Sequence, residues 1–209
     1  MRFLTTLLFI FSLASCYPSQ VFKTASNNVF LKGNSCVFEN DSVKIEYNLW
    51  AERGVVSFEL YNKLNTPLYI DWKTSAYITS NRSLNYWQDE TVKTTITDNS
   101  LFLNSNSKSV SKSVKYDRVS IIPPLSVISK STYNILPKEY HKKTKYSVGH
   151  YKPDNTPISF RSYLAISSSE DFKGTVNYID NSFYVYQVDE VKSKNKKPSP
   201  DSFWIIASK

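Results

Sequence analysis

The sequence predicts an all-β fold, an antiparallel two-layer β-sandwich with long polar loops. Three observations support this prediction. Short stretches alternate apolar and polar residues with a period of two, turn-forming residues separate these stretches, and no long stretch follows a helical period. Strands that are apolar on one face need a second layer to cover that face, which favours two packed sheets.

The clearest alternation lies in Val55–Ile78. A turn at residues 62–67 divides this stretch in two. Before the turn, one apolar face consists of Val56, Phe58 and Leu60. After the turn, it consists of Leu68, Ile70 and Trp72. We therefore expect two strands that share one apolar face, with Trp72 in the core. The same phase continues to Ile78, so the second strand is expected to run that far.

Two more strands are expected before this pair. Phe30–Phe38 is expected to hold the first strand, and Val43–Trp50 alternates as a second. Ala51–Gly54 has the composition of a four-residue hairpin loop. We therefore expect Val43–Ile78 to form a three-strand meander whose register is fixed by one apolar face.

The central part of the chain contains loops around one pair of strands. Asn99–Ser113 is rich in Ser, Asn and Lys and predicts an exposed loop. Val119–Ile122 comes before Pro123 and Pro124, and a strand pattern resumes in Leu125–Leu136. Because proline cannot donate to a strand ladder, the two prolines predict a bend or a sheet edge.

The last third of the chain predicts three further strand regions after a basic loop at Lys138–His150. Ile158–Ile166 alternates as a half-buried strand. Val176–Ile179 and Phe183–Val191 are expected to form a hairpin around Asp180-Asn181, and Phe203–Ala207 is expected to be the last strand.

The first sixteen residues have the pattern of a targeting segment. Arg2 supplies a positive charge, and Phe3–Phe11 is an apolar run too short for a permanent transmembrane helix. Residues 13–16, Leu-Ala-Ser-Cys, resemble the lipobox of bacterial lipoproteins. The resemblance implies a signal peptide at residues 1–15, cleavage before Cys16, and diacylglycerol on the Cys16 thiol. An ordinary secretory signal is the alternative.

The residues after Cys16 bear on location. In enterobacterial lipoproteins, an aspartate directly after the lipidated cysteine resembles a signal for retention in the inner membrane. Here that position is occupied by Tyr17. No acidic residue occurs in Tyr17–Val21, and such residues accompany export to the cell surface in some bacteria. We therefore expect a lipid-anchored protein of the outer membrane that faces the periplasm, with surface exposure left open. Residues 16–28 are expected to be a flexible tether, and residues 29–209 one domain.

The sequence contains no Gly-x-Ser-x-Gly elbow, no His-Glu-x-x-His motif, no paired cysteines at metal-binding spacing and no P-loop. With Cys16 lipidated, Cys36 lacks a disulfide partner and is expected to be a buried structural thiol. His141 and His150 lie in the basic loop and are expected to be exposed rather than a metal pair. Scattered carboxylates leave a glycosidase as an alternative. We expect a protein that is not an enzyme, with no cofactor apart from the lipid.

Aromatic residues are the main candidates for a binding surface. Trp87, beside Tyr86 in an irregular polar stretch, is the candidate for an exposed platform, with packing as the alternative. The strand expected at Phe183–Val191 has large side chains on both faces. Tyr184, Tyr186 and Val188 therefore form a candidate partner surface, unless a loop covers them.

Charge and modification patterns add two expectations. The formal net charge is +8, with lysine clusters at residues 138–145 and 192–197. An exported protein meets little nucleic acid, so we expect solvated loops and no nucleic-acid partner. Asp41-Ser42-Val43 resembles the O-glycosylation site of Bacteroidota, and Ser42 is the candidate acceptor.

The order of predicted elements over about residues 37–191 resembles the small immunoglobulin-like lipoprotein domains encoded in Bacteroidota genomes. The resemblance implies an Ig-like sandwich at the cell envelope. Our leading hypothesis is a non-catalytic, lipid-anchored interaction module whose partners are the bilayer and another envelope protein. The alternative is a glycan-binding module that uses exposed aromatic residues.

Overall fold

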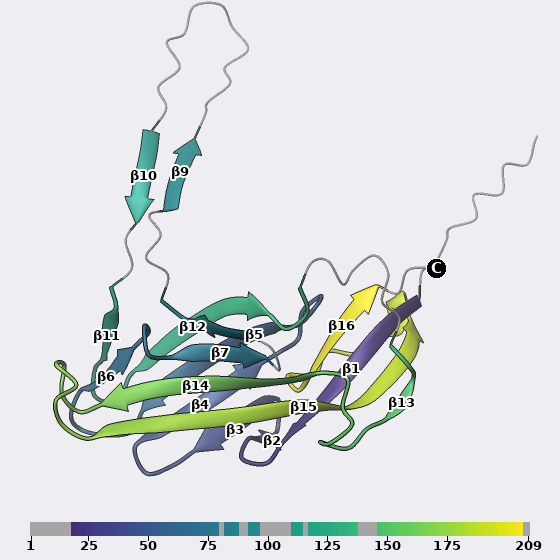
Figure 1. Ribbon diagram of the computed structural model, residues 1–209, viewed down its shortest axis with the longest axis horizontal. Helices are drawn as coiled ribbons and strands as arrows, with labels where there is room; N and C mark the ends of the chain where they lie inside the picture. The colour runs from purple at the N-terminus through teal and green to yellow at the C-terminus, as the bar shows by residue number, and fades with distance from the viewer. Residues whose placement is uncertain are drawn as a thin grey trace, which may run out of the picture.

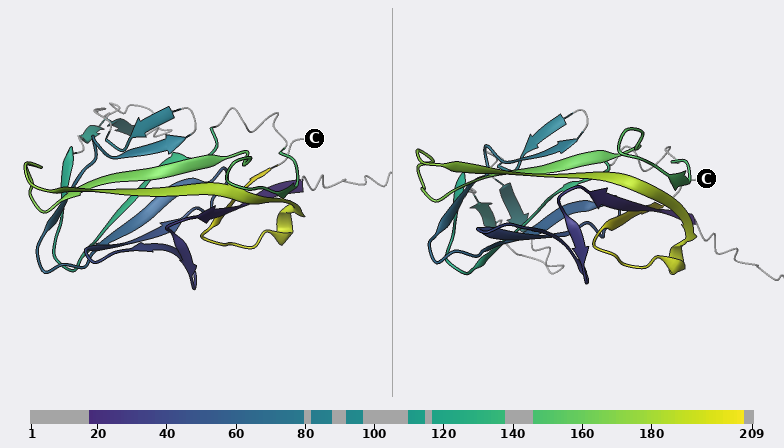
Figure 2. Two further views of the ribbon diagram at one scale, coloured as in Figure 1. Left: turned by 60° about the horizontal axis from the view of Figure 1, so that its bottom comes forward. Right: turned by 90° about the horizontal axis from the view of Figure 1, so that it is seen from below.

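Two antiparallel sheets face each other across one apolar core (Figures 1 and 2). This computed structural model describes residues 18–79, 82–87, 92–96, 110–114, 117–137 and 146–206. Within these ranges the regular structure is almost entirely β, with one 3-10 turn, η2 (Ser193–Asn195). The prediction of an all-β sandwich is confirmed. None of the described residues belongs to a helix long and apolar enough to cross a membrane.

The smaller sheet has five strands in the order β12-β5-β4-β3-β2. Their bounds are β12 (Val127–Asn134), β5 (Val55–Asn62), β4 (Val43–Asn48), β3 (Ser35–Glu39) and β2 (Phe30–Lys32). The larger sheet has nine strands, of which six follow the order β11-β6-β14-β15-β1-β16. These are β11 (Val119–Ile122), β6 (Leu68–Asp71), β14 (Ser159–Ser167), β15 (Val176–Lys192), β1 (Pro18–Ser26) and β16 (Ser202–Ile206).

Three short strands complete the larger sheet. They are β7 (Ala76–Thr79) beside β14, β8 (Arg82–Asn85) beside β7, and β13 (Gly149–His150) beside β15. A separate pair, β9 (Val92–Ile96) and β10 (Val110–Val114), forms its own two-stranded sheet. Residues 99–109 of the predicted polar loop lie outside the described ranges, and Val110–Ser113 of that loop belongs to β10.

The predicted meander is wrong at its third strand. β4 and β5 pair as expected, and a Cβ atom on Gly54 would lie 2.6 Å from Ile135, so only glycine fits this connection. β6, however, joins the larger sheet beside β11 and β14. The buried Asn62 side chain donates to the carbonyls of Ile122 and Pro123, at 3.0 and 3.1 Å, which stabilises the crossing between sheets.

The second strand of the central pair also ends earlier than expected. A turn separates β6 from β7, because the Asp71 carboxylate accepts from the Lys73 N–H at 2.9 Å and from the Thr74 hydroxyl at 2.9 Å. Trp72 nevertheless points into the core and is 4% exposed, as predicted. The Pro123-Pro124 bend is confirmed, since β11 and β12 belong to different sheets.

The hairpin predicted around Asp180-Asn181 is absent. β15 runs through both residues as one strand of 17 residues (Figure 1). Asp180 forms an ion pair with Arg161 on the neighbouring strand β14. Asn181 points inward, is fully buried, and donates to the Tyr47 hydroxyl at 2.8 Å. Both polar side chains find partners that are distant in the sequence, so they do not form a turn.

The predicted tether is wrong for Pro18–Ser26, which forms β1 between β15 and β16. Phe22 on this strand is fully buried and stacks on Phe203 with ring centroids 4.8 Å apart. The buried Gln20 side chain donates to the Tyr146 carbonyl at 2.7 Å and accepts from the Tyr146 N–H at 3.0 Å. The folded domain therefore includes residues from Pro18 onward.

Two other boundaries differ from expectation. The single strand predicted at residues 30–38 is a hairpin of β2 and β3. Gly33 has φ +61° at the first position of its two-residue turn, which is typical of a type II′ turn. In the predicted loop at 138–150, residues 138–145 lie outside the described ranges, while Gly149 and His150 form β13. The last strand, β16, agrees with prediction.

Candidate functional site

The edge strand β2 is the most exposed apolar part of the smaller sheet. It pairs with β3 on one side, and no other strand in the described ranges pairs with its outer side. Phe30 and Leu31 are 58% and 55% exposed, although both are large apolar residues. An exposed apolar strand edge can pair with a strand from another chain.

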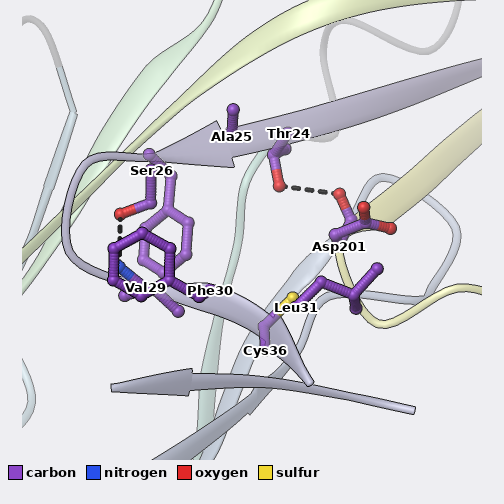
Figure 3. A pocket seen from close by; sticks show the side chains of 9 residues that line it. Thr24, Ala25, Ser26, Val29, Phe30, Leu31, Cys36 and Asp201 are labelled. Carbon is purple, nitrogen blue, oxygen red and sulfur yellow. Dashed lines mark hydrogen bonds between the residues drawn. The ribbon is translucent and has the colours of Figure 1, made fainter. Parts of the chain in front are cut away.

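A groove lies between the end of β1 and the β2–β3 hairpin, and we call it the edge groove (Figure 3). Its volume is about 190 Å³. The residues that line it are mostly small or apolar: Thr24, Ala25, Ser26, Val29, Phe30, Leu31, Cys36, Phe183 and Asp201.

Hydrogen bonds hold the walls of the edge groove. The Val29 N–H donates to the Ser26 hydroxyl at 3.1 Å, and the Thr24 hydroxyl donates to the Asp201 carbonyl at 2.6 Å (Figure 3). In the loop between β1 and β2, the Asn28 amide donates to the Asp180 carbonyl and to the Asn181 side-chain oxygen, both at 2.9 Å. The groove is therefore built on fixed backbone rather than on a loop with few contacts.

Cys36 lies in the edge groove as a free, buried thiol. Burial, with a further contribution from the negative charge of Asp201, raises the pKa of Cys36 to about 12. The thiol is therefore protonated at neutral pH and is a poor nucleophile. This confirms the prediction of a buried structural cysteine. His141 lies outside the described residues, and His150 is exposed on β13.

The described residues contain no group of three His, Cys, Asp or Glu side chains able to hold a metal ion. Asp71, one of the scattered carboxylates, is buried and receives two bonds from Arg118, at 3.1 and 2.6 Å. Together with its bonds to the β6–β7 turn, these contacts give Asp71 a structural role. What the edge groove offers chemically is an apolar recess beside a strand edge.

The three residues of the predicted partner surface, Tyr184, Tyr186 and Val188, do not share one exposed face in the structure. Val188 is fully buried in the core, so its prediction as a surface residue is wrong. Lys23 pairs with Gln187 and Thr24 with Val185, which leaves Tyr186 as the extra residue of a β-bulge. The bulge shifts the inward phase by one residue, so both Val185 and Val188 point inward. Tyr186 is half-buried, and its carbonyl accepts from the Tyr151 N–H at 2.8 Å.

Tyr184 is half-buried and lines a second groove, which we call the Tyr184 groove. Its volume is about 410 Å³, and the residues around it are Asn27, Ile78, Thr79, Pro153, Ser159, Phe160, Arg161, Ser182, Phe183 and Tyr184. Arg161 is held in a two-bond ion pair with Asp180. An aromatic ring, a guanidinium group and several hydroxyls therefore surround one recess.

The predicted aromatic platform at Tyr86 and Trp87 is wrong. Tyr86 is 2% exposed, and its hydroxyl forms a 3.0 Å hydrogen bond with the buried Ser162 hydroxyl. Trp87 is half-buried and packs against the core. The residues around this pair in the sequence are polar, so the sequence did not indicate that Tyr86, directly after β8, would point into the core.

The candidate modification sites have different outcomes. Cys16 lies outside the described residues, so its lipidation stays a prediction. Ser42 lies in the turn between β3 and β4, half-buried beside the exposed Asp41, and its N–H donates to the Asn40 side chain at 2.9 Å. Its glycosylation also stays a prediction.

The lysine clusters are described only in part. Lysines 138, 142, 143 and 145 lie outside the described ranges, whereas Lys192, Lys194 and Lys197 are exposed. The Lys196 ammonium lies 3.0 Å from the centroid of the Trp204 ring.

Sequence reasoning missed the β2 edge, although one signal for it was present. Gly33-Asn34 between apolar runs is a two-residue hairpin signal that would have divided Phe30–Phe38 into two strands. Comparison of the chain with models of known protein families, with curated proteins and with solved structures finds no match.

Proposed function

We propose that this protein is a lipid-anchored lipoprotein of the outer membrane whose sandwich binds an extended segment of another envelope protein along β2. The observation that carries the proposal is the outer side of β2, with which no strand of the described residues pairs, and where Phe30 and Leu31 are exposed beside the edge groove. The module is non-catalytic and needs no cofactor beyond the lipid on Cys16.

Strand addition suits the dimensions of this site. In this mode, main-chain hydrogen bonds to the sheet edge supply affinity, and pockets for alternate side chains supply specificity. The edge groove, at about 190 Å³, is smaller than the roughly 300–1,000 Å³ of small-molecule pockets. It is of a size to hold one or two apolar side chains of a bound segment.

The lipid supports the same function. Diacylglycerol on Cys16 with acylation of the new amino terminus anchors firmly, because each buried methylene contributes about 0.8 kcal/mol. Anchoring restricts the search for a membrane-associated partner to two dimensions. The protein then faces the periplasm from the outer membrane.

Site-specific photo-crosslinking in intact cells tests the docking edge. A photoreactive amino acid at Leu31 should yield a discrete adduct with one envelope protein. The same amino acid at Leu84, which is 37% exposed on β8, is the matched control and should not. Phe30→Lys should abolish the Leu31 adduct, because it replaces the exposed apolar ring beside the edge groove with a second positive charge on a three-residue strand. Equal adducts at both positions, or no effect of Phe30→Lys, would contradict the proposal.

A second candidate function is glycan binding at the Tyr184 groove, since rings combined with polar planar side chains suit a sugar. Isothermal titration calorimetry with envelope-derived oligosaccharides tests it. Binding should be lost in Tyr184→Ala and kept in Tyr178→Ala, because Tyr178 does not line this groove. Absence of heat with every oligosaccharide would remove this candidate.

A further inference from the structure

The first strand of the sandwich begins very close to the expected lipid. β1 starts at Pro18, and Tyr17 alone separates Pro18 from Cys16. Consecutive Cα atoms are about 3.8 Å apart, so the Cα atoms of Cys16 and Pro18 lie within about 8 Å of each other. A tether long enough to hold the domain away from the bilayer is therefore missing.

β1 is firmly held in the sheet from its first residue. It pairs with β15 from Pro18↔Lys192 to Ser26↔Phe183, and with β16 from Ser19↔Ile206 to Lys23↔Ser202. Releasing Pro18–Gln20 to form a tether would break both ladders and the bonds between Gln20 and Tyr146.

We infer that the Pro18 end of the sandwich lies directly on the headgroups of the membrane that holds the Cys16 lipid. The inference rests on the proposed lipidation. To the proposed lipidation, the inference adds a membrane-facing surface, an orientation of the sandwich and a partner, which is the anionic headgroup layer of that membrane. Figure 1 shows the start of β1 together with the ends of β15 and β16, and these elements form the proposed membrane-facing end.

The described residues at this end suit an anionic surface. Lys192 is exposed opposite Pro18, and Lys194 and Lys197 are exposed in the segment that follows it, whereas Lys196 lies over the Trp204 ring. Ile206, opposite Ser19, is 40% exposed, and Val148, just before β13, is 57% exposed. Glu190 is an exposed acidic residue nearby. Lysines with exposed apolar residues bind to anionic headgroups and the outer acyl boundary.

The same orientation places the docking edge away from the bilayer. A strand rises about 3.3 Å per residue, so Ser26 lies about 26 Å from Pro18 along β1. The edge groove is at the Ser26 end of β1. The lipid would thus hold one end of the sandwich at the membrane and leave β2 accessible to a partner.

Fluorescence quenching of the full lipidated chain tests the orientation. Lys192→Cys and Tyr178→Cys each introduce one exposed thiol on the same strand, β15, separated by about 45 Å of length along the strand at the usual rise. Cys36 is buried and protonated, so it should not react with the fluorophore. The labelled proteins are reconstituted into phosphatidylethanolamine–phosphatidylglycerol vesicles that contain a lipid with a nitroxide headgroup.

We expect at least three-fold stronger quenching at position 192 than at position 178. A ten-residue Gly-Ser insertion between Tyr17 and Pro18 should reduce quenching at position 192 toward the value at position 178. Equal quenching at both positions, or stronger quenching at position 178, would overturn the inference. So would unchanged quenching after the insertion.

Flotation of the same vesicles separates this inference from the proposed function. If the wild-type chain floats with the vesicles and Cys16→Ala does not, the anchor is established regardless of label position. Equal quenching in that case overturns the orientation alone. If the wild-type chain does not float, or if Cys16→Ala still floats equally after a high-salt wash that screens contacts with headgroups, the lipid anchor and the orientation are both overturned.

Discussion

The two edges of the smaller sheet are built in opposite ways. β12 is eight residues long and carries Lys130 opposite Phe58, on the face that points toward the larger sheet. The Lys130 ammonium lies 4.8 Å from the centroid of the core residue Trp72. β2 is three residues long and exposes Phe30 and Leu31.

An inward-pointing charge is one of the devices by which edge strands avoid pairing with other chains. β12 has this device, and its outward side chains are serines at positions 129 and 131 and, at its first residue, Val127, which is 51% exposed. β2 has no inward charge, and its Lys32 pairs with Glu39 on the neighbouring strand β3 at 3.5 Å. The difference teaches that an inward charge protects the β12 edge, whereas β2 exposes two large apolar side chains and depends on its short length and Lys32 alone.

The largest expected effect is in the core beneath β12. Trp72→Ala should lower the free energy of unfolding by about 3–5 kcal/mol, because it leaves a large cavity under Lys130. Tyr69→Ala, on the half-buried outer face of β6, should cost clearly less. Urea titration measures both. Equal losses would show that the larger sheet is covered on both faces.

Alkaline pH should weaken the same core. Burial raises the pKa of Tyr47 to about 12 and raises the pKa of Tyr77 and of Tyr86 still further. In the unfolded chain these tyrosines lose their hydroxyl protons near pH 10, which is the ordinary pKa of tyrosine. Above that pH the unfolded state therefore binds fewer protons than the folded state. Stability should then fall by about 1.4 kcal/mol per pH unit for each tyrosine, and should not change from this cause below pH 9.

Chemical denaturation at pH 9, 10 and 11 measures this slope. The variant Leu31→Lys, at the β2 edge, should show the same slope as the wild type, because no buried tyrosine titrates with it. A flat profile to pH 11 would mean that these tyrosines are not protected in the fold.

Asn28→Ala tests how firmly the loop before β2 is held. The substitution removes the bonds to the Asp180 carbonyl and to the buried Asn181 side chain, and should cost about 1–3 kcal/mol. Asn195→Ala, at an exposed position in η2, is the control and should be nearly neutral. If the two variants unfold at the same urea concentration, the edge groove is less rigid than we describe.

Lys130→Met should change assembly more than stability. Removing the inward charge opens β12 to pairing, so we expect concentration-dependent dimers by analytical ultracentrifugation. Burial lowers the pKa of Lys130, because the charged form is disfavoured. Relative to the methionine variant, the wild type should therefore gain stability as pH rises toward the ordinary lysine value near 10.5. A variant that stays monomeric would remove the contrast between the two edges.

The smallest expected change in stability is at β2. Leu31→Lys should alter the free energy of unfolding by less than about 0.5 kcal/mol, because Leu31 is largely exposed. Partner adducts formed by a photoreactive residue at Phe30 should nevertheless be lost. A loss of several kcal/mol would show that β2 is structural and would weaken its assignment as a docking edge.

Much of the strand content follows from local alternation. The period of two located β4, β5, β14 and β16 and placed Trp72 inward, because a pleat turns successive side chains to opposite faces whatever lies across the core. The buried state of Cys36 followed from its apolar neighbours. These properties depend on residues close in the sequence, so the sequence determined them by itself.

Tertiary structure decided which sheet each strand joins. β5 and β6 have the same inward alternation although they belong to facing sheets, because both sheets point their apolar side chains at one core. β1 was hidden because the polar groups of Gln20 and Thr24 find partners only at Tyr146 and Asp201. Asp180-Asn181 has turn composition but lies within a strand, since Arg161 and Tyr47 bind both side chains.

The candidate site depends almost wholly on such distant contacts. The bulge at Tyr186 moves Val188 into the core, and its position is set by pairing with β1, more than 160 residues earlier in the chain. Phe30 and Leu31 are exposed because β2 is the last strand of its sheet. Being an edge is a property of the assembled sheet, and no run of residues encodes it alone. The sequence by itself therefore determined the strands and their inward faces, while the order of strands decided which of them a partner can reach.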